Sequence, residues 1–181
     1  VFSPGTTIVR NSTCRIDSVQ GFQSLPDNVL IQVRLDDNNL TEIPAGLSGV
    51  QSKITGYFFG LNTITSLTSS LVTAPALRTL DVTNAGLTSL PDETTLGNVI
   101  NLYLDGNNLS ELPNLQNLST LRKLRLRNNQ LTTEALDALL VQLINNTQGN
   151  PSELSIAGNP GLAGVNQANL ATVRAQGWTE G

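Results

Sequence analysis

The stretch NLYLDGNNLSELPNL, residues 101–115, spaces its leucines in a way that fits neither a helix nor a strand. The leucines follow one another at intervals of 2, 5, 3 and 3 residues: Leu102, Leu104, Leu109, Leu112 and Leu115. A helix brings apolar residues back every three or four positions, and a strand every second position. The stretch therefore predicts a composite unit, in which a short strand is followed by a turn and a returning arc.

The same spacing recurs along the chain. LIQVRLDDNNLTEIP (30–44) matches VINLYLDGNNLSELP (99–113) position by position, including the final proline. The other copies are ITGYFFGLNTITSL (54–67), LRTLDVTNAGLTSLP (77–91), LRKLRLRNNQL (121–131) and the looser LSIAGNPGL (154–162). The position that usually holds asparagine falls at 38, 62, 85, 107, 129 and 159, so the steps are 24, 23, 22, 22 and 30 residues. All of these steps except the last lie within 20–29 residues, a period typical of stacked structural repeats.

This pattern resembles the leucine-rich repeat, L-x-x-L-x-L-x-x-N-x-L. The resemblance implies an α/β solenoid, a right-handed superhelix with a parallel β-sheet on its concave face and an irregular or helical convex side. It divides the chain into an N-terminal arm and cap (1–29), leucine-rich repeats (30–162) and a C-terminal capping helix and tail (163–181). The LxxLP form, GNPGL and the closing RAQGW resemble short leucine-rich domains of bacterial surface proteins and bacteriophage structural proteins, while NNLTEIPAGL also fits a plant-type repeat.

Burial explains the repeated positions. One coil cannot cover its own leucines, and each fully buried leucine contributes roughly 1.5–3 kcal/mol, so coils stack into a continuous core. An asparagine where the chain leaves the strand offers donors and an acceptor to buried backbone groups. The expected asparagine ladder consists of Asn38, Asn62, Asn107, Asn129 and Asn159. The third repeat has Ala85 at this position, so either Asn84 reaches inward through a bulge or the backbone there binds water.

The sequence also predicts one helix on the convex side and caps at the two ends of the repeat region. TTEALDALLVQLINNT (132–147) predicts a convex helix behind Thr133 as its N-cap, because its apolar residues fall on one helical face. These residues are Leu136, Leu139, Leu140, Leu143 and Ile144. GVNQANLATVRAQGW (164–178) predicts a short helix with Trp178 as a lid, and GFQSLP (21–26) resembles half a repeat.

Composition excludes several functions. The chain has no histidine, which rules out Ser-His-Asp triads and His-containing metal sites, and its single cysteine, Cys14, cannot form an internal disulfide. A net charge of −4 without a long basic run argues against nucleic acid and anionic membranes as partners. No apolar stretch approaches the roughly 20 residues that span a bilayer, and no motif calls for a cofactor. We therefore expect no cofactor, no metal and no membrane insertion.

The residues expected to point out of the strands indicate where a partner would bind. The middle column of this concave face reads Arg34, Phe58, Asp81, Tyr103, Arg125 and Ser155, with Asp105, Lys123 and Arg127 beside it. Exposed aromatic and arginine side chains are enriched at interfaces. The alternative is that Phe58 belongs to a shifted register and is buried, while the cations are solvated.

Three functions compete on this evidence. The first is a non-enzymatic recognition or adhesion module that binds a protein or a glycan through the concave face. The second is a structural accessory of a virion or cell-surface assembly, joined to the rest through the arm VFSPGTTIVR. Both imply an extracellular, cell-surface or virion location. The third is a glycoside hydrolase using Asp81 and Asp105, which strand geometry places about 8 Å apart. Against it, nothing on an open, wet face is expected to raise the pKa of one aspartate.

Overall fold

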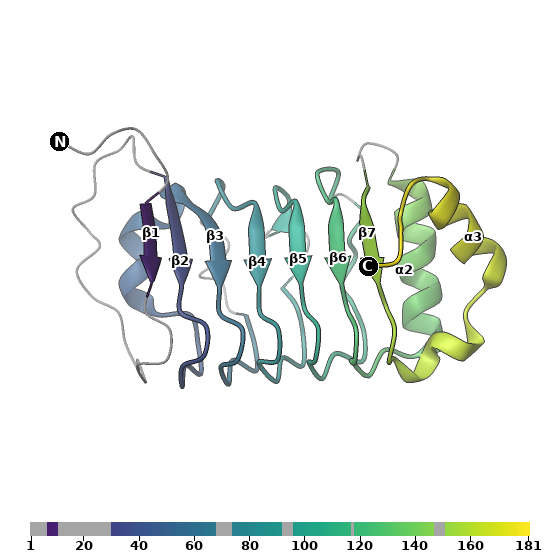
Figure 1. Cartoon of the computed structure of the whole chain (residues 1–181), viewed down its shortest axis with the longest axis horizontal. Coiled ribbons are helices and arrows are strands. Elements are labelled where there is room, and N and C mark those ends of the chain that lie inside the picture. The colour runs from purple at the N-terminus through teal and green to yellow at the C-terminus, as the bar shows by residue number, and fades with distance from the viewer. Residues whose placement is uncertain (1–6, 11–29, 68–73, 92–95, 117, 147–150) are drawn as a thin grey trace.

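The computed structural model describes residues 7–10, 30–67, 74–91, 96–116, 118–146 and 151–181. Seven short strands form one parallel sheet in which spatial order follows chain order. The strands are β1 (Thr7–Arg10), β2 (Ile31–Arg34), β3 (Ile54–Phe58), β4 (Thr79–Asp81), β5 (Asn101–Tyr103), β6 (Lys123–Arg125) and β7 (Glu153–Ser155). Between β2 and β7, the chain passes behind the sheet after each strand and returns to the front one strand closer to β7. This path makes the coil right-handed (Figure 1). The predicted solenoid is confirmed.

The core lies between the sheet and the returning arcs. Leu102 and Leu104 point inward from the strand segment, and Leu109 and Leu115 point inward from the arc that follows it; all four are at most 1% exposed. The equivalent residues of neighbouring repeats are buried in the same way and form one continuous cluster. The spacing of 2 and 5 residues thus reflects alternation along a strand followed by a turn.

Among the described residues, the convex side carries helices toward both ends of the solenoid. A 3₁₀ helix, η1 (Ala45–Lys53), follows the first repeat, and α2 (Thr133–Asn145) follows the fifth. The expected apolar face of α2 packs inward, with Ile144 partly buried. The helix starts one residue earlier than predicted, because the N-cap is Thr132 and not Thr133. The Thr132 side chain accepts a hydrogen bond from the backbone N–H of Ala135 at 3.2 Å.

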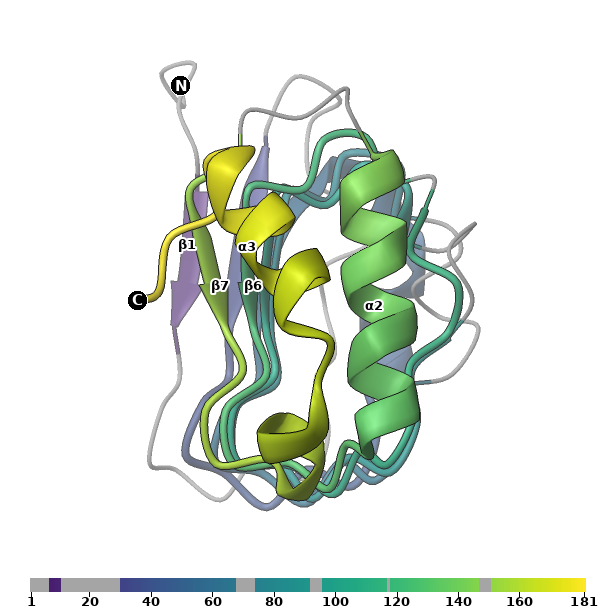
Figure 2. The same ribbon diagram turned by 90° about the vertical axis from the view of Figure 1, so that its right-hand side faces the viewer.

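The C-terminal end of the core is covered by α3 (Gln167–Ala175), preceded by the 3₁₀ helix η3 (Pro160–Gly164). In the view along the solenoid, α3 lies between the sheet and α2 (Figure 2). Leu170 and Val173 of α3 are buried, and Trp178 is only 4% exposed. Thr179 then pairs with Glu153 beside β7, so the chain end also protects the edge of the sheet.

The N-terminal side extends the sheet beyond the repeats seen in the sequence. Thr7–Arg10, part of the expected arm, forms β1 and pairs in parallel with β2. Cys14 and the half repeat at 21–26 lie outside the described residues. The expected boundary between the N-terminal arm and the repeats, at residue 30, therefore separates two strands that pair in the same sheet.

Four asparagines connect consecutive repeats through buried hydrogen bonds. Asn107 is typical: its amide nitrogen donates to the carbonyl oxygens of Leu104 at 2.9 Å and of Val82, one repeat earlier, at 2.8 Å. Its Oδ1 accepts the backbone N–H of Leu87 at 2.9 Å. Asn62, Asn129 and Asn159 make the same kinds of bond. At the first repeat, the Asn38 amide donates to the carbonyl oxygens of Leu35 and Asp36.

At the gap in the ladder, the next repeat binds the backbone N–H of Ala85. Asn84 is exposed and has a φ of 53°, so the bulge that would turn it inward is not formed. Its side-chain oxygen lies over Gly106, 1.8 Å from where a Cβ of that residue would be, so a larger residue at 106 would have to displace the Asn84 amide. The backbone N–H of Ala85 needs no water, because Asn107 Oδ1 accepts it at 3.1 Å.

We expect Asn107→Ala to lower the free energy of unfolding by about 1–3 kcal/mol, because it leaves buried backbone groups on two repeats without partners. Urea denaturation followed by far-UV circular dichroism measures this change. A variant that unfolds at the parent's urea concentration would show that the ladder adds nothing to stability.

Ala85→Asn is the reciprocal variant. By analogy with Asn62 Oδ1, which accepts the Leu40 N–H at 2.9 Å, an asparagine at 85 would bond the Ile64 N–H. We therefore expect an unchanged or raised stability in the same experiment. Clear destabilisation would mean that the space around buried Ala85 is closed to an amide.

Candidate binding face

The face of the sheet turned away from the core, here called the concave face, carries the outward side chains in rows across the strands. The parallel register places Arg34, Phe58, Asp81, Tyr103, Arg125 and Ser155 side by side, in the expected column. The row two residues later along the chain holds Asp36, Gly60, Thr83, Asp105 and Arg127. The strands therefore hold the candidate residues on a fixed backbone.

Phe58 lies in register and points outward, so the alternative of a shifted, buried Phe58 does not hold. Its neighbours Tyr57 and Phe59 point inward, are fully buried and stack with ring centroids 5.1 Å apart. The Phe58 ring is half-buried because it lies along the sheet over Gly56, where a Cβ would come within 2.9 Å of Cε2. On the concave face, the Arg34 guanidinium carbon lies 3.8 Å from the centre of the Phe58 ring. This is cation–π stacking.

Tyr103 forms a second aromatic–arginine pair. The Arg125 guanidinium carbon lies 5.0 Å from the centre of the Tyr103 ring. Arg125 also donates to Glu153 on β7, from Nε to Oε1 at 2.5 Å and from Nη2 to Oε2 at 3.2 Å. Lys123 Nζ lies 3.9 Å from the same carboxylate. The hydrogen bond from Arg125 lowers the pKa of Glu153, whereas partial burial raises the pKa of the Tyr103 hydroxyl.

From the sequence, Lys123, Arg125 and Arg127 are expected as three cations on the concave face, and the role of Glu153 is not apparent. The structure pairs two of them with one nearly buried carboxylate. The signal was present in the sequence, because Glu153 precedes Ser155 by the same two residues that separate Lys123 from Arg125. The net positive charge at this end of the face is therefore smaller than expected.

The two aspartates proposed for hydrolysis are held by backbone groups. Asp81 Oδ1 accepts the N–H of Thr83 at 3.1 Å, and Asp105 Oδ1 accepts the N–H of Arg127 at 2.7 Å. The expectation that nothing raises a pKa here is wrong for Asp105, because partial burial raises the pKa of its carboxyl above the usual value. The bond from Arg127 opposes this shift.

A shallow hollow of about 510 Å³ joins most of these side chains. Its lining consists of Arg34, Asp36, Phe58, Gly60, Leu61, Asp81, Thr83, Asn84, Tyr103, Asp105 and Arg125. Six of the nine expected concave-face residues line it; Lys123 and Arg127 do not, and neither does Ser155, which is fully buried. Leu61, Asp36 and Asn84 enter the site from the loops that follow the strands, which the analysis of strand columns did not include. The hollow has the size of a small-ligand or peptide site.

The described part of the chain shows neither a metal-ligand cluster nor a membrane-spanning helix. It contains no group of three or more acidic, cysteine or histidine residues arranged to hold a metal ion. Within the same residues, no helix has the length and apolar character needed to cross a bilayer.

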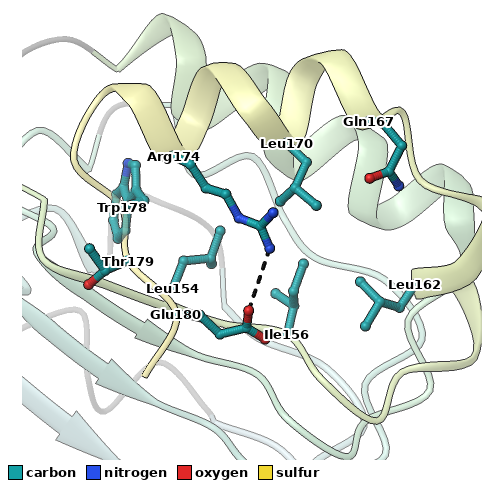
Figure 3. A pocket seen from close by; sticks show the side chains of 9 residues that line it. All are labelled: Leu154, Ile156, Leu162, Gln167, Leu170, Arg174, Trp178, Thr179 and Glu180. Carbon is teal, nitrogen blue, oxygen red and sulfur yellow. Dashed lines mark hydrogen bonds and ion pairs between the residues drawn. The ribbon is translucent and has the colours of Figure 1, made fainter.

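A second hollow, of about 240 Å³, opens between β7 and α3 (Figure 3). Leu154 and Ile156 lie on one side of it and Leu170 of α3 on the other, all 6–8% exposed, and an ion pair between Arg174 and Glu180 lies beside it at 3.5 Å. Leu154 and Ile156 belong to the end of the core that α3 and Trp178 cover. We therefore assign this hollow to the cap.

Comparisons with known proteins agree with the repeat architecture. A family model described as Leucine Rich Repeat matches residues 120–141. A leucine-rich-repeat protein of Leptospira interrogans is 23% identical over 73% of this chain and 38% of its own length, with a TM-score of 0.59. Internalin C2 of Listeria monocytogenes is 19% identical over 97% of this chain and 80% of its own, with a TM-score of 0.61.

A further internalin of Listeria monocytogenes, inlF, is 18% identical over 90% of this chain and 57% of its own length, with a TM-score of 0.54. At these identities the common feature is the fold. The chain spans less than two thirds of the Leptospira protein and of inlF. The repeat spacing, the family match at residues 120–141 and the common solenoid show that the chain has a leucine-rich-repeat fold.

Proposed function

We propose that this protein is a non-enzymatic recognition module that binds a partner protein through its concave face, with Phe58 and Tyr103 at the centre of the contact. The observation that carries the proposal is the pair of half-buried aromatic rings on β3 and β5, on either side of Asp81, each stacked with an arginine. Rings held by the backbone and by stacking lose little conformational entropy on binding, and Tyr and Arg are frequent hot-spot residues.

The charges on this face favour an oriented complex. Asp36, Asp81 and Asp105 lie in the hollow on the side where the strands end, whereas Lys123 and Arg125 share Glu153 at the β7 end. Separated charges fix the orientation of a partner and select against mismatched surfaces. A glycan is the second ligand class, because the hollow combines aromatic rings with carboxylates. Either ligand suits adhesion outside the cell, at a cell surface or on a virion.

Two other functions are less well supported. The first is attachment to a larger assembly through the N-terminal arm. Thr7–Arg10 of this arm forms a strand of the sheet, so these residues already pair within the protein itself. A carboxylate-dependent hydrolase has to use Asp81 and Asp105 although a backbone N–H occupies one oxygen of each. An assay of glycan hydrolysis with Asp105→Asn as the control tests the latter role directly.

The test of the recognition function begins with displayed seven-residue random peptides, selected on the immobilised protein, and with a glycan array. Dissociation constants of the recovered peptides or glycans are then measured for the parent and for Phe58→Ala/Tyr103→Ala. We expect a loss of at least about 2 kcal/mol, or roughly thirtyfold in Kd, with little change in Tm. The concave face is refuted as the site if the double variant binds like the parent.

The matched control is Val141→Ala on α2, which shortens a side chain that is 45% exposed on the convex side. It is expected to leave Kd unchanged. Gln142 is unsuitable as a control, because its Oε1 accepts the backbone N–H of Leu115 at 2.6 Å and so supports the fold.

A further inference from the structure

Leu61 combines an unfavourable backbone with an exposed apolar side chain. Its φ is 57°, in the left-handed region that branched and bulky residues rarely adopt. Its side chain is 55% exposed, the highest value among the large apolar residues of the described chain. Leu61 therefore gains little from burial in the free protein while holding a disfavoured conformation.

The same position in every other repeat is occupied by a residue that tolerates this conformation. These residues are Asp37, Asn84, Gly106, Asn128 and Gly158, and all of them have positive φ. The fold thus requires a left-handed residue here, and Asp, Asn or Gly meets the requirement at lower cost. The backbone N–H of Leu61 donates to the Thr83 carbonyl at 2.8 Å, a bond that any of these residues would also make. Nothing in the fold accounts for leucine.

The position of Leu61 suggests what its side chain does. Leu61 lines the hollow together with Phe58. Gly60, which also lines it, has no side chain to fill the space between the Phe58 and Leu61 side chains. Asp36, in the loop after β2, and Asp81, at the end of β4, line the same hollow on either side of them. An apolar floor is thus bordered by two carboxylates.

We infer that Leu61 and Phe58 receive an apolar side chain of a partner protein segment, and that Asp36 and Asp81 select a lysine or arginine next to it. This rests on the proposed function and names the partner's chemistry. The charges support a cationic segment, because the hollow contains three aspartates and two arginines, and one of the arginines, Arg125, is already paired with Glu153. Complementary charge beside an apolar contact gives orientation and selectivity.

The first arm of the test needs no ligand. Leu61→Asn and Leu61→Gly relieve the backbone and are expected to raise Tm by about 2–4 °C, measured by thermal denaturation. The reciprocal control is Asp37→Leu, which places leucine at an exposed position with a φ of 57° and is expected to lower Tm by a similar amount. A fall in Tm for Leu61→Asn would overturn the inference, since it would show that Leu61 serves the fold.

The second arm uses displayed random heptapeptides selected on the parent protein. We expect the selected peptides to carry lysine or arginine next to a leucine, isoleucine or aromatic residue. Leu61→Asn is expected to raise Kd at least tenfold, Asp36→Asn to raise it less and to weaken its dependence on salt, and Val141→Ala to leave it unchanged. Selected peptides without a cationic residue would overturn the inference.

The two proposals fail separately. If Phe58→Ala/Tyr103→Ala abolishes binding while Leu61→Asn binds like the parent, the concave-face function stands and the role of Leu61 is refuted. If neither variant affects binding, both are refuted. If both variants lose binding and Leu61→Asn is more stable than the parent, Leu61 is established as a residue kept for recognition at the expense of stability.

Discussion

Trp178→Ala is expected to lower the free energy of unfolding by about 3–5 kcal/mol, the range for removing a buried aromatic side chain. Trp178 is 4% exposed and faces the apolar end of the core beside Leu154 and Leu170. A solenoid has an open core at each end, so the residue that closes it protects every repeat behind it. Guanidinium denaturation, followed by far-UV circular dichroism in parent and variant, gives the difference.

Arg174→Ala is the control for this experiment. Arg174 lines the same hollow, but its ion pair with Glu180 has side chains that are 55% and 62% exposed, so its loss is expected to cost at most about 1 kcal/mol. The lid interpretation fails if the two variants lose similar amounts of stability, because apolar closure by Trp178 would then contribute nothing special.

The strands and their order were predictable from the sequence because one physical requirement sets them. Leucines such as Leu102 and Leu104 have to reach a common core in every coil, and this fixes both the repeat length and the inward side of each strand. Once the inward positions are known, the outward ones follow, and Tyr103 and Arg125 are placed next to each other by counting. Repetition supplies the register that single strands lack.

Features that do not repeat were harder to predict. β1 lies before the first recognisable copy, and its residues Thr7–Arg10 carry no leucine spacing, so the sheet begins earlier than expected. Glu153 lies within the longest step, between positions 129 and 159, where α2 interrupts the repeat spacing. The pairing of Glu153 with Lys123 and Arg125 consequently went unnoticed, although it decides how much positive charge the face presents.

A pattern of apolar residues also does not predict the backbone conformation of a single residue or the burial of a carboxyl group. The left-handed column is visible in the sequence as Asp37, Asn84, Gly106 and Asn128, and Leu61 is the exception to it. Apolar periodicity alone treats Leu61 as an ordinary surface residue. The raised pKa of Asp105 depends on how deeply its carboxyl is buried among neighbouring side chains, which a linear sequence does not specify.

Leu104→Ala is expected to lower the free energy of unfolding by about 2–5 kcal/mol. Leu104 is fully buried in the middle of the core, between Val82 and Leu126 of the adjacent repeats, which are equally buried. Repeats on both sides hold these neighbours in place, so the cavity left by the truncation cannot collapse easily. Urea denaturation measures the loss, and following it by both circular dichroism and tryptophan fluorescence reports whether the cap around Trp178 unfolds together with the middle of the solenoid.

Leu112→Ala provides the matched comparison within the same repeat. Leu112 is only partly buried against the core, so the same truncation there removes fewer contacts and is expected to cost clearly less. Equal losses at the two positions would contradict the assignment of Leu104 to the interior of a stacked core. Coincident transitions by the two probes would show that the repeats unfold as one unit, whereas an earlier fluorescence transition would show that the C-terminal cap separates first, as nearest-neighbour stacking of repeats allows.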